Sequence, residues 1–275
     1  MLQFSIPITL PSGKIVRVPE LPNKLYLNLI KYCENRDLEG VNNFFLQFLN
    51  IPADLDILDR LYLLVTYRII FISDSIIFTS NDGKNLTFSL DIILGKIEDF
   101  SRGYDEIIME DGITVQVGLP TTLFYGDEHN RVGDVIKSIQ IKDIIIDFKN
   151  LSKEERDNIL KKIPLKVVIK VQDYIDRITR HTSNMILIDS NEEFNIHQYS
   201  VDLLSNSTML FVCSLYSHNL IDYFETLYGY VTKISADPEF YNNLSPVETR
   251  IVLNIHNKEV EKENKELKNQ QQQIL

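Results

Sequence analysis

Two tight-turn signals in the middle of the chain constrain its fold most strongly. The segments SIIFTS and NLTFSLDI flank the turn residues 81–84, and the segments EIIME and ITVQVGL flank Asp111 and Gly112. An Asp-Gly pair supplies the positive φ angles that a two-residue hairpin turn requires. Alternation places four apolar side chains of the second hairpin on one face: Ile113, Val115, Val117 and Leu119. The sequence therefore predicts antiparallel hairpins here.

The amino-terminal segment predicts one more strand pair. Phe4, Ile6, Ile8 and Leu10 alternate with smaller or polar residues, and PSGK then turns the chain into IVRV. Pro7 has no backbone N–H to donate to a ladder, so this strand is expected at a sheet edge. A further strand, over residues 139–148, is expected to close the sheet.

Helical patterns fill the rest of the chain. Three helices are predicted after the first strand pair, from apolar residues at helical spacing: Leu25, Leu29, Tyr32 and Cys33; Leu38, Val41, Phe45, Phe48 and Leu49; Leu58, Leu61, Val65 and Ile69. Ser152 and Glu155 form a capping-box pattern, and Pro164 divides the two helices that follow it. Residues 184–189 are expected to form a short strand.

These patterns predict an α+β fold. A mostly antiparallel sheet of hairpins with helices is expected over residues 1–150, followed by a helical part over residues 151–257. The apolar residues of 201–231 indicate a core helix or one that packs against another chain, beginning near 205–208. The tyrosines of this region are amphipathic and suit protein interfaces, so we predict partner binding by Tyr216, Tyr223, Tyr228 and Tyr230.

The last helix has two unlike halves. Its start is specified by Ser245 as N-cap, Pro246 at the first helical position and Glu248 three residues after the serine. Val247, Ile251 and Ile255 are expected to face the core. The segment 258–275, called the arm below, holds four lysines and four glutamates up to Lys268, with Val260 and Leu267 as its internal apolar residues and candidate partner contacts. It is either a solvated helical tail or an element that a partner orders.

Composition restricts the class of protein. With 275 residues, 44% of them hydrophobic, the chain can bury a sizeable core, and its net charge of −11 without a long basic run argues against nucleic acid as a partner. Cys33 and Cys213 form no CxxC, and Cys33 lies on a predicted apolar helix stripe, which indicates a buried thiol and a reducing compartment. No signal peptide is predicted, because the amino-terminal segment lacks a basic start followed by a long apolar core. No membrane-spanning stretch is predicted, because the longest apolar run is short and contains Arg68.

Motifs of common enzymes are absent from the sequence: there is no Walker loop, dinucleotide fingerprint, HExxH or nucleophile elbow. Two weaker sets remain. Asp127, Glu128, His129 and Asp134 could bind a divalent cation. The second set consists of His197, Cys213 and His218, whose last two members lie on different helix faces. We predict no catalytic residue, metal or cofactor.

Three segments resemble a known family: IPITLPSGKIVRVPELPNKLYLNLIKYC, IDFKNLSKEERDNILKKIPLKVVIKVQDYI and LSPVETRIVLNIHNKEVEKENKEL. Their arrangement resembles the baseplate hub and hub-assembly proteins of T-even-like bacteriophages with contractile tails. The resemblance implies a non-enzymatic role in building the tail hub in the host cytoplasm, with other hub proteins as partners. Homo-oligomerisation and the choice between hub subunit and assembly factor stay open. The alternatives are a metal-dependent enzyme using the 127–134 loop and an acidic adaptor or regulator.

Overall fold

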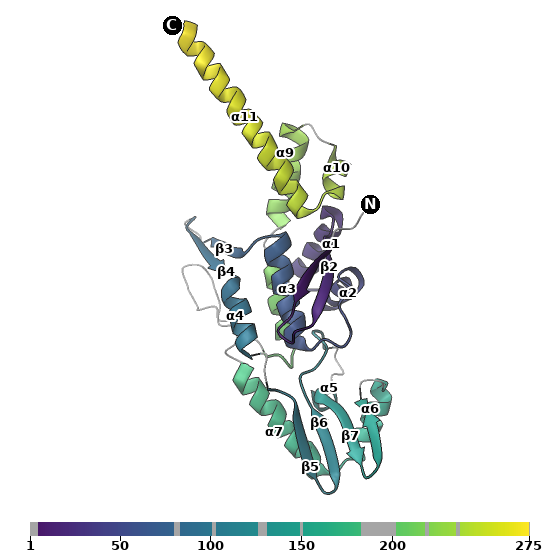
Figure 1. The fold of residues 1–275 in the computed structure, drawn as a ribbon. Helices are drawn as coiled ribbons and strands as arrows, with labels where there is room; N and C mark the ends of the chain where they lie inside the picture. Colours follow the sequence, from purple (N-terminus) through teal and green to yellow (C-terminus); the bar gives the residue numbers. More distant parts are fainter. Residues whose placement is uncertain are drawn as a thin grey trace.

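The computed structural model describes eight stretches of the chain: residues 5–79, 83–100, 103–125, 131–148, 151–182, 202–217, 220–234 and 237–274. Figure 1 shows an elongated molecule with a central body, a sheet-containing part at one end and a group of helices at the other. The strands form antiparallel hairpins, and the carboxyl-terminal part is helical, so the predicted α+β class is confirmed. Among the described residues, no helix has the length and apolar character that a membrane crossing needs.

The central body is built from the beginning of the chain and one later helix. Its elements are β1 (Ser5–Thr9), β2 (Ile15–Pro19), α1 (Asn23–Glu34), α2 (Leu38–Phe48), α3 (Ile57–Phe71) and α8 (Ser207–Ser217). The two strands form a sheet of their own, so Pro7 lies in an edge strand as predicted. All three predicted helices are present. Helix α8 contacts each of them and is buried along most of its length.

A second hairpin, which was predicted, and a helix, which was not, lie beside α3. They are β3 (Ser75–Thr79), β4 (Asn85–Ser89) and α4 (Asp91–Phe100). The predicted strand 85–92 was too long, because the chain enters the helix at Asp91. Ile93 and Ile97 are four residues apart and both buried, and α4 contacts α3. The tertiary contact of this apolar pair therefore favours the helix over a longer strand.

The four-stranded sheet at the other end has the order β5-β6-β7-β8. Its strands are β5 (Glu106–Glu110), β6 (Ile113–Val117), β7 (Ile136–Ile141) and β8 (Ile144–Asp147). Asp111 and Gly112 have φ angles of 50° and 75°, which confirms the predicted turn. The prediction of one strand over 139–148 was wrong. Lys142 adopts a φ of 54° and reverses the chain, so this segment is a hairpin and Ile141 pairs with Ile144.

Three helices accompany this sheet: α5 (Arg131–Val135), α6 (Lys153–Leu160) and α7 (Leu165–Thr182). The Ser152 capping box is confirmed, because the Ser152 N–H donates to Glu155 Oε2 at 2.8 Å and the Glu155 N–H donates to Ser152 Oγ at 3.3 Å. Pro164 separates α6 from α7 as predicted. Helix α7 lies along β5 (Figure 1) and buries an apolar stripe that includes Val171 and Ile175. The strand predicted at 184–189 lies outside the described residues.

The remaining helices are α9 (Leu220–Lys233), α10 (Pro238–Asn243) and α11 (Pro246–Ile274). Helix α11 begins with the predicted capping box, since the Ser245 N–H donates to Glu248 Oε2 at 2.9 Å and the Glu248 N–H donates to Ser245 Oγ at 3.1 Å. It continues without a break, and Figure 1 shows its far half extending away from every other element. Helix α10 was not predicted.

The predicted inward face of α11 was partly wrong: Val247 packs against the core, but the two isoleucines do not. Ile251 and Ile255 are each 53% exposed, whereas Thr249 is 5% exposed. Thr249 Oγ1 accepts a hydrogen bond from Asn23 Nδ2 at 2.7 Å, and the Thr249 carbonyl oxygen accepts one from the Tyr230 hydroxyl at 3.1 Å. Polar contacts of Thr249 therefore decide which face of α11 meets the body, so the isoleucines face outward.

Candidate functional site

Tyr216 is the first of the predicted partner-binding tyrosines, and it is fully buried. Its hydroxyl donates to the Leu64 carbonyl oxygen at 2.8 Å, and its ring lies 5.7 Å from the ring of Phe45. Burial raises the pKa of the Tyr216 hydroxyl well above its ordinary value. Tyr216 was therefore wrongly predicted as a surface residue, because it fills the space between α8, α3 and α2.

Tyr223 and Tyr230 join the last helices to one another. Both rings stack edge-to-face on Tyr241, at centroid distances of 5.4 Å and 5.1 Å. The Tyr223 hydroxyl donates to Asn242 Oδ1 at 3.1 Å, and Tyr230 bonds to α11 as described above. With exposures of 6% and 0%, these two side chains also fail as surface anchors. The rings and hydroxyls of both tyrosines therefore contact other residues of this chain.

Tyr228 is exposed, unlike the other three tyrosines. Its side chain is 69% exposed, and Phe224 and Val231 beside it are 50% and 40% exposed. Residues four and three positions apart share one helix face, so these side chains form an apolar strip on the outside of α9. The strip was not predicted as a unit, although the 224–228–231 spacing signals it. We call this strip the α9 strip.

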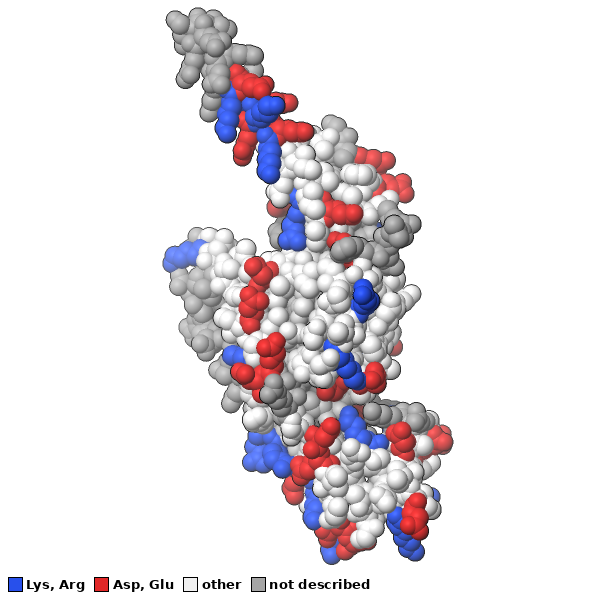
Figure 2. All heavy atoms as spheres, viewed as in Figure 1, with Lys and Arg blue, Asp and Glu red and all other residues white. Residues whose placement is uncertain are grey.

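The arm is the second exposed element. Val260 is 38% exposed, and Leu267 lies at a later turn of α11, where the structure describes the helix but not the side chain. Figure 2 shows basic and acidic side chains around the arm, next to a largely uncharged surface at the base of α11. The arm therefore presents charge and a few apolar residues to solvent.

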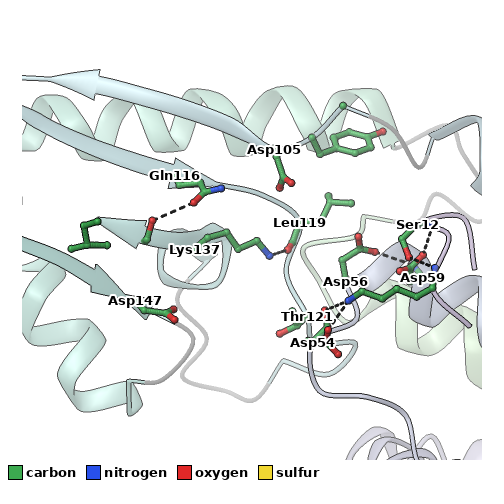
Figure 3. Close-up of a pocket in the computed structure, with 15 residues that line it drawn as sticks. Ser12, Asp54, Asp56, Asp59, Asp105, Gln116, Leu119, Thr121, Lys137 and Asp147 are labelled. Carbon is green, nitrogen blue, oxygen red and sulfur yellow. Dashed lines mark hydrogen bonds and ion pairs between the residues drawn. The ribbon is translucent and has the colours of Figure 1, made fainter. Parts of the chain in front are cut away.

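A polar cleft of about 570 Å³ lies between the body and the four-stranded sheet (Figure 3). Asp54, Asp56 and Asp59 line it from the start of α3, and Lys137 and Asp105 line it from the sheet side. The cleft is therefore formed by segments that are distant in sequence.

Hydrogen bonds and one ion pair engage charged groups on each side of the cleft. Asp56 Oδ1 accepts the Asp59 N–H at 2.9 Å and so caps α3, while Asp59 Oδ1 accepts the Ser12 N–H at 3.1 Å. Lys14 Nζ lies 2.6 Å from Asp54 Oδ2, and Lys137 Nζ donates to the Leu119 carbonyl oxygen. Burial raises the pKa of the Asp56 carboxyl. We interpret the carboxylates on the body side as structural, because Asp56 caps α3 and Asp54 and Asp59 bind the 12–14 turn.

The predicted metal sets are only partly described. Asp127, Glu128, His129, His197 and His218 lie outside the described residues, while Asp134 lies in α5. Within the part of the chain that the structure describes, no group of three His, Cys, Asp or Glu side chains could hold a metal ion. The metal-loop hypothesis gains no support from the described residues.

The two cysteines lie together in the core between α1 and α8. Both are free thiols, with exposures of 2% for Cys33 and 3% for Cys213, so the predicted burial of Cys33 is confirmed. A hydrogen bond to Cys213, together with burial, raises the pKa of the Cys33 thiol. These thiols are part of the packing that holds α8 in the body.

The fold defines a class of protein: an α+β subunit with antiparallel hairpins and a helical carboxyl-terminal part. Residues 1–200 match the family model of the T4 bacteriophage base plate protein. This match covers more than half of the 275 residues, and the chain belongs to that family. It is a T4-like phage baseplate protein. No curated protein and no solved structure matches the chain significantly.

The family membership confirms the baseplate part of the resemblance seen in the sequence. It places the protein in the virion tail baseplate, among other baseplate proteins as its interaction partners. The matched region ends before α8, so α9 and α11 lie beyond it.

Proposed function

We propose that this chain is a non-enzymatic structural or assembly protein of the central hub of the baseplate, and that it acts by binding other hub proteins. The observation that carries the proposal is the baseplate family match over residues 1–200. The sequence resemblance to hub and hub-assembly proteins supports the finer assignment. In this role the protein is made in the host cytoplasm and joins other tail proteins there.

Two exposed elements support binding to proteins. The α9 strip presents two aromatic side chains and a valine, and aromatic residues are enriched at the centres of protein interfaces. The arm extends from the body as a helix, and helices with an apolar face commonly bind in grooves or against other helices. The net charge of −11 suits protein partners better than nucleic acid.

The test is co-purification of the tagged full chain with the other baseplate hub proteins encoded by the same phage. The chain ending at Asn257 is the comparison, because it keeps the docked half of α11 and removes the arm. We expect the full chain to recover hub proteins and the shortened chain to recover less. Recovery of outer baseplate proteins without any hub protein would contradict the hub assignment.

A variant of the α9 strip separates it from the arm. Phe224→Ser with Tyr228→Ser removes two exposed aromatic side chains, and Leu165→Ser with Ile169→Ser on α7 is the matched control, since these residues are 73% and 51% exposed. We expect only the α9 variant to lose hub proteins. Equal recovery by both variants would remove the α9 strip from the interface.

Purified phage particles distinguish a hub subunit from an assembly factor. Mass spectrometry of intact particles would detect a subunit at a fixed ratio to other hub proteins. An assembly factor would be present in infected cells and absent from the particles.

A further inference from the structure

The arm continues the docking face of α11 into solvent. Thr249 and Leu253 lie on the side of α11 that packs against the body, and Val260 follows Leu253 by seven residues. Seven residues nearly complete two helical turns, so such positions return to within about 20° of one face. Leu267 and Ile274 occupy the next two positions of the same repeat. One aliphatic residue per heptad therefore recurs along α11, from the body to its end.

Beyond the body this stripe has no neighbour among the described residues. Residues 257–266 are all exposed, and Figure 1 shows no other element alongside this half of the helix. Helices pair side by side through two apolar core positions in each heptad, and this stripe supplies one of the two. The stripe is narrow, because the alternate core positions of the heptad hold His256 and Glu263.

Three glutamates and three lysines of the arm form two rows, while Glu261 and Lys268 lie outside them. Glu259, Glu263 and Glu266 have the spacing of one helix face and border the aliphatic stripe. Lys258, Lys262 and Lys265 form the adjacent row, farther from the stripe. Opposite charges also lie four residues apart, at Glu261–Lys265 and Lys262–Glu266, so the arm is helical by itself while the glutamate row borders the stripe. The side of the stripe nearest the acidic row favours a partner with positive charge.

A second copy of the chain is a poor occupant for this stripe. In a parallel pair, Glu263 would face Glu263 of the other copy at a core position. In an antiparallel pair, the flanking positions of one copy face the same flanking positions of the other, which brings Glu259 and Glu266 against glutamates. Both orientations place like charges at close range.

We propose that the arm pairs with a helix of another baseplate protein, one that carries an aliphatic heptad stripe flanked by lysine or arginine. This inference rests on the proposed function for the identity of the partner, while the charge preference follows from the arm itself. The partner helix would cover Val260 and the later stripe positions and place its basic side chains against the glutamate row.

The test measures binding of the full chain to two labelled synthetic peptides by fluorescence anisotropy. The peptides share the same aliphatic heptad core and differ only at the flanking positions, which are lysine in one and glutamate in the other. We expect the lysine-flanked peptide to bind, the glutamate-flanked peptide to fail, and salt to weaken the binding. Val260→Asn should weaken it about tenfold or more, because it places an amide in the stripe.

Charge reversal provides the sharpest variant. E259K/E263K/E266K changes three charges from −1 to +1, so the formal net charge moves from −11 by six units to −5 and the chain stays acidic. Long-range attraction alone would still favour the lysine-flanked peptide. Local pairing instead predicts a switch to the glutamate-flanked peptide. The matched control K258E/K262E/K265E reverses the neighbouring row and should keep the lysine preference. Circular dichroism verifies that each variant is folded.

The outcomes are distinguishable. An unchanged preference after reversal of the glutamate row, or binding of neither peptide, would overturn the inference, as would self-association of the full chain that depends on the arm. Hub proteins lost on truncation at Asn257, without a lysine preference, would overturn only the charge inference. A lysine preference without any hub protein recovered would leave the arm inference standing and contradict the hub assignment.

Discussion

Helices α8 and α11 both come from the carboxyl-terminal part of the chain, but their surroundings are opposite. Helix α8 lies among α1, α2 and α3, and Phe211, Leu215 and Tyr216 within it are fully buried. Helix α11 is anchored over its first turns, and its side chains from 257 to 266 are exposed. Position late in the chain therefore does not determine a role at the surface. One helix completes the core, and the other is available to a partner.

Replacing one side chain in α8 and one in α11 should give the largest difference in stability between the two helices. Tyr216→Ala should lower the free energy of unfolding by about 3–5 kcal/mol, because it leaves a cavity in the core. Val260→Ala should change it by less than about 0.5 kcal/mol, as expected for an exposed position. Urea unfolding of the two variants measures both values. Similar losses in the two variants would show that the arm is not separate from the cooperative unit.

The next test concerns the base of α11. Asn23 is 2% exposed, and its Nδ2 donates to the Tyr241 carbonyl oxygen at 2.9 Å as well as to Thr249 Oγ1. Asn23→Ala leaves buried acceptors without this donor, so we expect a loss of about 1–3 kcal/mol in unfolding free energy. Hydrogen exchange should show faster opening in α10 and in the first turns of α11, with α8 unchanged. Equal acceleration in α8 would contradict the separation of the two helices.

The start of α11 offers a smaller effect. Ser245→Ala removes the oxygen that accepts the Glu248 N–H, and loss of such a cap costs about 1 kcal/mol. Differential scanning calorimetry measures the resulting decrease in Tm. Asn254→Ala, at an exposed position of the same helix, is the control and should leave Tm unchanged or slightly raised.

The smallest effect is a pH dependence at α3, one of the helices around α8. Burial raises the folded-state pKa of Asp56 above its unfolded value, so the native state holds the proton more tightly. The stability linked to this group is fully present below the unfolded pKa, near 3.9, and is lost as pH rises through the folded pKa. Asp56→Asn keeps a capping oxygen and removes the titration. The unfolding free energy of Asp56→Asn should therefore increase relative to that of wild type as pH rises from about 4 to 7. Urea unfolding of both proteins across this pH range measures the difference, and a difference that does not change with pH would contradict the prediction.

Features fixed by local chemistry could be predicted from the sequence. The capping boxes at Ser152 and Ser245 and the turn at Asp111-Gly112 depend on residues within a few positions of one another. Burial of particular tyrosines could not be predicted, because Tyr228 and Tyr230 are two residues apart on α9 and face different surroundings. The docked face of α11 depends on Asn23, which is separated from Thr249 by 226 positions. The α+β class was therefore accessible, and the exposed surfaces required the tertiary structure.

The position of α8 has a consequence for synthesis on the ribosome. Helices α1, α2 and α3 are made first, but the apolar surface that α8 covers stays open until residues 207–217 have left the exit tunnel. The four-stranded sheet lies between them in sequence, and each of its strands pairs only with strands next to it in the chain, so the sheet has little need to wait for distant contacts. We expect the nascent chain to complete this later-made sheet before its earlier-made helical body, with the exposed helices open to chaperones in the interval.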